Sequence, residues 1–171
     1  MPEETPLNHA LPTLVFAADH AGFELKAYLK AACIAKGYST EDTGCYDTNA
    51  VDYPLMVDQA VQAMQNQHSG PSNNADKKKE MPPVMGVFCC GSGVGVAIRA
   101  NRYPFIRAVR AHERLSASLS RKHNNTNVIC FGARFIAPEM AMDILETWLD
   151  TAFEGERHAQ RVSQMDSLPV L

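Results

Sequence analysis

The chain has 171 residues, of which 46% are hydrophobic, and it carries a formal net charge of −3 with a sequence pI near 6.0. This length suits one compact domain with a substantial core, so we expect a single domain over residues 1–171. The lack of a basic excess argues against nucleic-acid binding, and no apolar run approaches the roughly 18 residues that cross a bilayer.

The N-terminus and the cysteines predict a soluble cytoplasmic protein. Residues 1–12 are acidic and contain prolines, unlike a signal peptide, and we expect them to form a loose tail. The five cysteines include no C-x-x-C pair, which favours neither a disulfide framework nor a zinc site. We therefore expect free thiols in a reducing compartment and no bound metal.

The first third of the chain predicts two strand–helix units. Residues 13–18 (TLVFAA) are typical of a buried strand, and the helix that follows has apolar residues at i, i+4, i+7 and i+8 and ends at Gly37. Residues 38–43 suit a second strand. Pro54 then suits the first turn of a second helix, which we expect to continue through Met64.

Residues 66–83 (NQHSGPSNNADKKKEMPP) interrupt this pattern. They are polar, rich in Ser, Asn, Lys and Pro, and lack hydrophobic periodicity, so we interpret them as a surface insertion loop. The lysines at 77–79 are flanked by Asp76 and Glu80, which favours a solvated face over a binding patch.

The remainder of the chain predicts three further strands. A buried strand from Val84 leads into a glycine loop and a helix, and further strands are expected at 106–111 and 127–131. Helices are expected at 112–122 and 138–151 and from near Glu156, and the run 123–126 (HNNT) is expected to break the helical pattern.

Alternating strands and helices imply a parallel sheet that is covered on both faces through right-handed crossovers. We expect a Rossmann-like three-layer α/β/α sandwich with five parallel strands and an extra C-terminal helix. Ligands of such sheets bind at the carboxyl ends of the strands. This rule gathers the loop at Asp19 and His20, residues 47–53, the loop at 90–92 and the exit at 132–134 on one edge.

The glycine loop, GSGVGV at 91–96, predicts a cradle of backbone amides. No lysine follows Gly95, so the loop is no Walker motif, and the dinucleotide fingerprint would need its third glycine one place later. The arginine that closes a cysteine-phosphatase loop is also missing. The loop alone leaves a nucleotide-binding module without turnover as one hypothesis.

Several side chains are candidates for chemistry on pattern alone. Strand alternation sends Cys89 and Cys90 to opposite faces, so one can be core and the other catalytic, and both interpretations of Cys90 stay open. His123 is likewise left undecided between turn chemistry and acid–base catalysis. Arg157 and Arg161 stand four apart on a predicted helix, and we favour a phosphate clamp because the glycine loop lacks a cation of its own.

Five segments together resemble one enzyme family. FAADHAGFELK, VDYP, CCGSGVGVAIRAN, SRKHNNTNVICFGAR and EGERHAQRV, in this order and spacing, are similar to ribose-5-phosphate isomerase type B, whose wider family includes galactose-6-phosphate isomerase subunits. The resemblance covers the chain from about Leu14 to about Ser167. It implies a cofactor-free aldose-ketose isomerase of the pentose phosphate pathway, which interconverts ribose 5-phosphate and ribulose 5-phosphate through a cis-enediolate.

The resemblance also assigns catalytic roles to individual residues. It makes Cys90 the base and gives His123 the opening of the furanose ring. Ser92 stands where many members have threonine, and its hydroxyl delivers a proton to the C1 or C2 oxygen. Asp19 contacts sugar hydroxyls. Another branch of the family uses a glutamate just after the last glycine of the loop, where this chain has Val96.

The resemblance further implies substrate contacts and a shared site. The implied substrate-binding residues are His20, Tyr53, Gly91, Gly93, Val94, Gly95, Asn124, Arg134, Arg157 and Arg161, with the phosphate expected mainly at His20 and the last two arginines. Members form homodimers or dimers of dimers with active sites built from both subunits. An isomerase of a six-carbon sugar phosphate, allose 6-phosphate or galactose 6-phosphate, remains the alternative within the family.

Overall fold

The structure, a computed structural model, describes residues 11–68 and 84–167. The strands are β1 (Thr13–Ala18), β2 (Thr40–Asp42), β3 (Val84–Cys90), β4 (Ala108–Arg110) and β5 (Val128–Gly132). The helices are α1 (Phe23–Ala35), α2 (Tyr53–His68), α3 (Val94–Ala100), α4 (Arg114–Asn124), α5 (Pro138–Leu149) and α6 (Arg157–Asp166). All five strands pair in parallel in the order β2-β1-β3-β5-β4, which confirms the predicted fold class.

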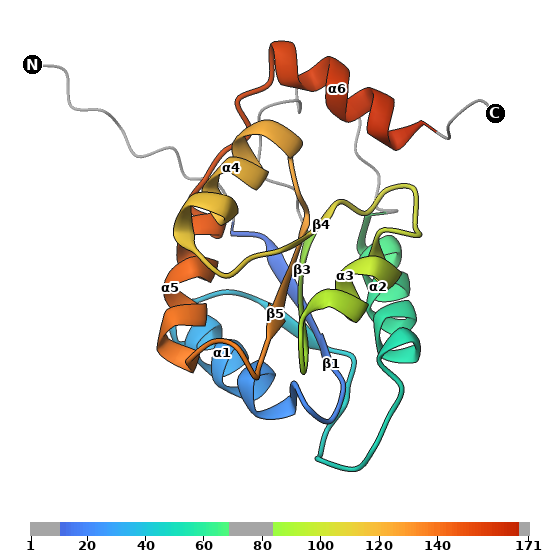
Figure 1. The fold of residues 1–171 in the computed structure, drawn as a ribbon, viewed down its shortest axis with the longest axis vertical. Coiled ribbons are helices and arrows are strands. Elements are labelled where there is room, and N and C mark those ends of the chain that lie inside the picture. Colours follow the sequence, from blue (N-terminus) through green and yellow to red (C-terminus); the bar gives the residue numbers. More distant parts are fainter. Residues whose placement is uncertain (1–10, 69–83, 168–171) are drawn as a thin grey trace, which may run out of the picture.

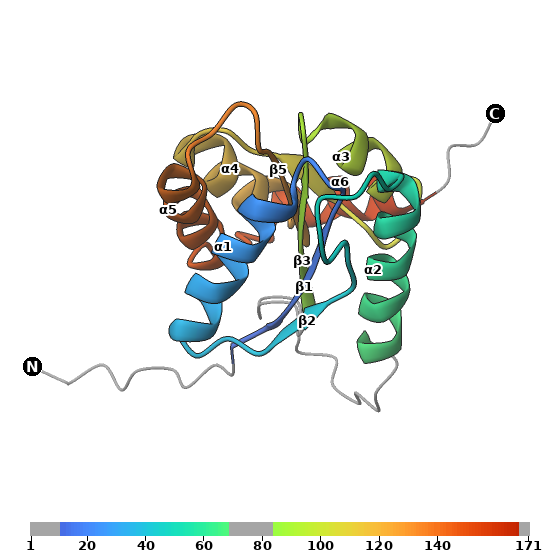
Figure 2. The ribbon, with the colours of Figure 1, turned by 90° about the horizontal axis from the view of Figure 1, so that it is seen from below.

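Side-chain alternation along the strands divides the core into two layers. Leu14, Phe16 and Ala18 of β1 pack with apolar residues of α1 and α5, whereas Val15 and Ala17 pack with residues of α2 and α3. Figure 2 shows these two helical layers on either side of the sheet, with α4 beside α5 and with α6 crossing one end. Burial on both faces explains why the strands read as continuous apolar runs.

Several predicted boundaries differ from the structure: the strands predicted at 38–43 and 106–111 are shorter, and two helices end later than predicted. Helix α4 does not end before His123 but continues through Asn124, because Asn125 is the residue that adopts the left-handed conformation (φ 46°) in which asparagine is tolerated. Helix α2 continues to His68, so the first three residues of the predicted 66–83 loop are helical. Asn66 is exposed and the side-chain amide of Gln67 donates to Glu41, so neither residue needs a loop conformation to satisfy its polar groups. The rest of that loop, and residues 1–10 of the predicted tail, lie outside the described residues.

The cysteines are free thiols, as the sequence predicted. Cys33, Cys45, Cys89, Cys90 and Cys130 are all free and buried. Among the described residues, none of the helices combines the length and the apolar character that a bilayer crossing requires.

Candidate active site

Three strand exits converge at the carboxyl edge of the sheet, as the sequence predicted. The amide of Asp19 donates to the carbonyl oxygen of Cys89 (3.3 Å), and the amide of Ala133 donates to that of Cys90 (2.9 Å). The amide of Arg134 donates to the carbonyl oxygen of Gly91 at 3.1 Å. These bonds tie the loops after β1, β3 and β5 together around the end of β3.

The Cys90 thiol lies at the centre of this edge. Its sulfur accepts a hydrogen bond from the amide of Gly93 at 3.1 Å, and the residue packs on the α2 and α3 side of the sheet. Cys89 packs on the opposite side, where burial raises the pKa of its thiol. The predicted division of the pair between two faces is therefore confirmed, and Cys90 is the cysteine beside the glycine loop.

The glycine loop is held in a shape that side chains cannot share. Gly93 has φ 75°, and a Cβ there would lie 2.8 Å from the backbone nitrogen of Gly132. A Cβ on Gly132 would lie 2.4 Å from the carbonyl oxygen of Ser92. The Ser92 hydroxyl oxygen accepts a bond from the amide of Val94 at 3.2 Å, which keeps that hydroxyl beside the loop.

Two predicted substrate residues lie against this loop. A Cβ on Gly95 would come within 2.6 Å of the ring of Tyr53, and one on Gly91 would come within 3.1 Å of the guanidinium of Arg134. The phenol and the guanidinium therefore pack directly on the loop backbone. Larger residues at either glycine would push one of them away.

Asp19 and His20 complete the carboxyl-edge group. Asp19 is 8% exposed, and its carboxylate accepts a bond from the amide of Gly22 at 3.0 Å. The exposed His20 accepts one at Nδ1 from the amide of Val51 (3.3 Å), which joins the loop after β1 to the segment before α2. We call Asp19, His20, Tyr53, Arg134 and the loop 90–95 the carboxyl-edge cluster.

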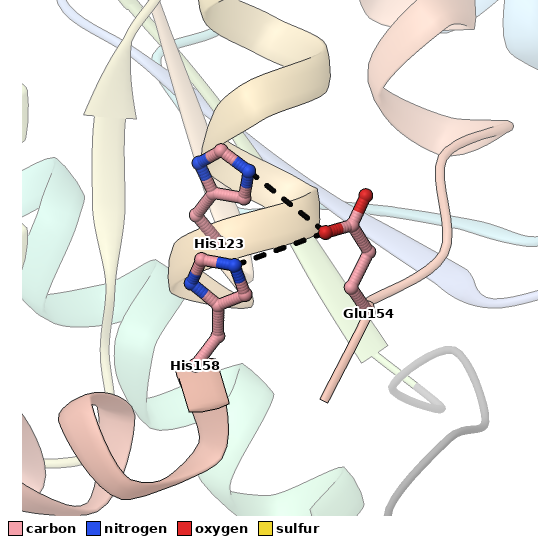
Figure 3. A group of neighbouring side chains, drawn as sticks. All are labelled: His123, Glu154 and His158. Atoms are coloured by element: carbon pink, nitrogen blue, oxygen red, sulfur yellow. Dashed lines mark ion pairs between the residues drawn. The ribbon is translucent and has the colours of Figure 1, made fainter. Parts of the chain in front are cut away.

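The other predicted site residues gather elsewhere. His123 lies in the last turn of α4 and His158 in the first turn of α6, with their ring centroids 4.3 Å apart and the rings 9° from parallel. Glu154 Oε2 lies 3.9 Å from Nε2 of His123 and 3.8 Å from Nε2 of His158 (Figure 3). The Nε of Arg157 donates to Nε2 of His158 at 3.3 Å.

Asn124 and Arg161 belong to the same group, because they follow His123 and Arg157 on α4 and α6. Asn124, Arg157 and Arg161 are exposed. We call His123, Asn124, Glu154, Arg157, His158 and Arg161 the amino-edge cluster.

Strand register places the two clusters at opposite edges of the sheet. Cys90, the last residue of β3, pairs with Gly132 at the end of β5. His123 lies before the start of β5 at Val128, and Val128 pairs with Gly86 in the first half of β3. Four residues of strand separate the two levels, about 13 Å at roughly 3.3 Å per residue. Figure 1 shows α6 at one end of the molecule and the β1–α1 connection at the other. Within one chain, the Cys90 thiol and the His123 ring therefore do not meet.

Comparison with known proteins identifies the family. The profile of the ribose/galactose isomerase family matches residues 14–165. The chain belongs to the ribose/galactose isomerase family. It is 36% identical over 155 residues to ribose-5-phosphate isomerase B of Escherichia coli K12, covering 91% of this chain and 95% of that protein.

Solved structures of the family have the same fold. A ribose 5-phosphate isomerase from Thermotoga maritima superposes with a TM-score of 0.79 at 35% identity, covering 91% of this chain and 97% of that one. Ribose-5-phosphate isomerase B from Mycoplasma genitalium, solved with bound ribulose-5-phosphate, gives a TM-score of 0.75 at 29% identity over 92% and 96% of the two chains.

In this isomerase-family chain, a buried lysine that the sequence did not single out supports the carboxyl-edge cluster. Lys26 is 1% exposed, and its Nζ donates to Asp42 (2.5 Å) and to the carbonyl oxygen of Cys45 (2.6 Å). Burial works against the charge of Asp42, but bonds from Lys26 and Lys30 outweigh it and lower the pKa of the carboxyl group. Lys26 thereby fastens the loop after β2 to α1. In the sequence, the indication of this burial was the position of Lys26 beside Leu25 and Leu29 on the apolar face of the predicted helix.

Arg110 supports the glycine loop in a similar way. Its Nε donates to the carbonyl oxygen of Ser92 at 2.7 Å, and its guanidinium lies 5.5 Å from the centroid of the Phe135 ring. Its position as the last residue of β4, at the carboxyl edge, was the only sequence signal for this contact.

Within the described residues, His123, Glu154 and His158 form the group whose composition suits a metal, since their ligand atoms lie within 4.8 Å of one another. The nearly parallel rings, however, direct their Nε2 lone pairs side by side and not toward one point. Nε2 of His158 already accepts the bond from Arg157. We therefore assign no metal to this group, and the expectation of a cofactor-free protein stays a prediction.

Proposed function

We propose that the protein is an aldose-ketose isomerase that interconverts ribose 5-phosphate and ribulose 5-phosphate through a cis-enediolate, without a cofactor. The observation that carries the proposal is the Cys90 sulfur beside the amides of the glycine loop at the carboxyl edge of the sheet. Membership of the family and the ribose-5-phosphate isomerase relatives support the substrate.

The reaction begins with the closed sugar. His123 acts as acid and base toward the ring oxygen and the C1 hydroxyl, which opens the furanose and exposes the aldehyde. Arg157, Arg161 and His20 hold the phosphate. The remaining sugar hydroxyls are contacted by Asp19, Tyr53, Asn124 and Arg134.

Proton transfer then takes place at Cys90. The thiolate removes the proton from C2 and the C1 carbonyl oxygen becomes anionic, giving the enediolate. Amides of the loop from Gly91 to Gly95, other than those of Gly93 and Val94 that already bond Cys90 and Ser92, stabilise this charge, an effect typically worth several kcal/mol. Ser92 relays a proton between the oxygens of C1 and C2. Cys90 returns its proton to C1, so the aldose becomes the ketose without net loss of protons or electrons.

We further propose that the active unit is a homodimer, or a dimer of dimers, in which each site combines the carboxyl-edge cluster of one subunit with the amino-edge cluster of its partner. The opposite positions of Cys90 and His123 support this, since the reaction needs both. Exposed apolar side chains beside the glycine loop, at Tyr53, Leu55, Val94 and Ile98, offer a surface for a second copy to cover.

The free cysteines support a reducing compartment, and we propose a cytoplasmic enzyme. A six-carbon sugar phosphate remains the alternative substrate, because the family profile covers ribose and galactose isomerases.

The deciding experiment is a coupled assay of the purified protein with ribose 5-phosphate, allose 6-phosphate and galactose 6-phosphate. We expect the highest kcat/KM with ribose 5-phosphate. A preference for a hexose phosphate would replace the proposed substrate. No turnover with any sugar, together with thermal stabilisation by NAD or ATP and not by ribose 5-phosphate, would instead favour a nucleotide-binding module.

A further inference from the structure

His158 lies between two residues of the proposed site. One face of its ring is stacked on His123 at a centroid distance of 4.3 Å, and its Nε2 accepts a hydrogen bond from Nε of Arg157 at 3.3 Å. Its side chain is only 7% exposed, whereas that of His123 is 38% exposed. His158 is therefore the inner partner of both contacts, and His123 and Arg157 are the ones that face outward.

The hydrogen bond fixes the protonation of His158. An Nε2 that accepts from Arg157 carries no proton, so the ring is neutral with its proton on Nδ1. Burial lowers the pKa of His158, and the charges of His123 and Arg157 lower it further, which favours the same neutral form. Glu154 Oε2 lies 3.8 Å from Nε2, beyond hydrogen-bonding distance, so it does not compete for this nitrogen.

The two contacts have different consequences. With its Nε engaged by His158, Arg157 keeps both terminal amino groups for phosphate oxygens, and its guanidinium plane is no longer free to rotate. The stacked ring face, in turn, restricts the plane of the His123 imidazole and so the direction in which its nitrogens point.

We propose that His158 is a positioning residue that orients Arg157 through Nε2 and His123 through its ring face, without touching the substrate itself. The inference rests on the proposed function, because it assumes that Arg157 holds the phosphate and that His123 opens the sugar ring. It links phosphate binding and ring opening to one buried side chain.

Two substitutions separate the two contacts. His158→Phe keeps a flat ring against His123 but lacks an acceptor for Arg157, whereas His158→Gln keeps an acceptor oxygen but lacks the ring. For His158→Phe we expect KM for ribose 5-phosphate and Kd for inorganic phosphate to rise about tenfold, as for a lost bond to a charged group, with kcat little changed. For His158→Gln we expect Kd for phosphate to stay near wild type and kcat to fall about tenfold.

The direction of the reaction supplies a second readout. Ribulose 5-phosphate carries its phosphate on the hydroxyl that would close a furanose ring, so it enters the site as an open chain. We therefore expect His158→Gln to lower kcat for ribose 5-phosphate more than kcat for ribulose 5-phosphate, both measured at saturating substrate. A residue that only supports packing would slow both directions alike.

Arg157→Lys provides the matched control, because it removes the Nε donor, keeps the charge and leaves His158 in place. We expect it to weaken phosphate binding about as much as His158→Phe, and we expect the double variant to be no weaker than either single variant. The Arg157→Lys comparison with the wild type also stands if His158→Phe does not fold.

Equal effects of His158→Phe and His158→Gln on both phosphate binding and kcat, or unchanged phosphate binding in Arg157→Lys, would overturn the proposal. A wild-type protein that binds phosphate through Arg157 but converts no sugar phosphate would reject the proposed function instead. The Kd values of the variants for inorganic phosphate, measured by calorimetry, would then still decide whether His158 orients Arg157.

Discussion

The amide of Gly93 donates a hydrogen bond to the sulfur of Cys90 across 3.1 Å, at the point where β3 turns into α3. This bond holds the thiol beside the glycine loop, where Gly93 takes a conformation with φ 75° and its N–H faces the end of the strand. The shape of the loop and the position of the thiol are thus coupled. Substitutions at Cys90 and at Gly93 test the two in turn.

Replacing Cys90 tests the base. We expect Cys90→Ala to lower kcat by about 10²–10⁴-fold or more, because the proton at C2 loses its acceptor, while phosphate binding is kept. The matched control is Cys89→Ala, which removes the neighbouring thiol from the opposite face of the sheet and is expected to retain turnover. Substantial turnover in Cys90→Ala would reject Cys90 as the base.

Replacing Gly93 tests the loop. A side chain at φ 75° costs about 1–2 kcal/mol, and its Cβ would also lie 2.8 Å from backbone atoms of Gly132 and Phe131. We expect Gly93→Ala to lower both the melting temperature and kcat. The control is Gly37→Ala, which shares a positive φ (89°) but meets nothing within 4 Å, so only the conformational cost should appear. Equal loss of activity in both variants would argue against a specific role of the loop.

Mixing two inactive variants tests the shared site. Cys90→Ala damages the carboxyl-edge cluster and His123→Asn the amino-edge cluster, so a mixed dimer would contain one intact site. If subunits exchange at random, we expect refolded equimolar mixtures to recover about a quarter of wild-type activity, as follows from two-fold symmetry. Each variant refolded alone is the control. A mixture that stays inactive although mixed dimers form would place both residues in one chain's site.

The lowered pKa of His158 predicts a pH dependence of stability. At pH values below about 6.5 the unfolded chain binds a proton at His158 before the folded chain does, so the free energy of unfolding decreases as the pH falls. We expect the melting temperature between pH 7.5 and 5 to fall more for the wild type than for His158→Phe.

The charged groups around His158 act in both directions, since His123, Arg157 and Arg161 disfavour its protonation and Glu154 favours it. Burial of Asp42 is outweighed by bonds from Lys26 and Lys30, which lower the pKa of its carboxyl group. Bonds from Arg99 and Tyr103 lower the pKa of Asp58, so the contribution of these two carboxyl groups is lost only in more acidic solution. Identical pH profiles for the wild type and His158→Phe would contradict the prediction.

Deleting residues 69–83 tests the predicted insertion. Its anchors, His68 and Val84, are the end of α2 and the start of β3, away from Cys90. We expect a short glycine-serine linker in its place to leave kcat near the wild-type value. Because the amino-edge cluster lies at the same end of the sheet as Val84, KM for ribose 5-phosphate is measured as well. A folded variant without turnover would show that the insertion takes part in catalysis.

The amino-acid sequence by itself determined the parallel sheet and its carboxyl-edge cluster. The apolar runs and the alternation that sends Cys89 and Cys90 to opposite faces are local properties of the chain, and parallel strands bring their exits to one edge whatever the details of packing. The same rules therefore placed Asp19, Cys90 and Arg134 together.

The tertiary structure alone decided where the other residues lie. His123 and His158 are far apart in the chain, and their stacking depends on α6 lying against the end of α4. The hydrophobic periodicity of the two helices does not predict this arrangement. The burial of Lys26 in α1 likewise depends on Asp42, a residue of β2 that offers the charge it needs. Local patterns carry no information on such pairings, because a buried contact between distant segments is stabilised only once the whole sheet has formed.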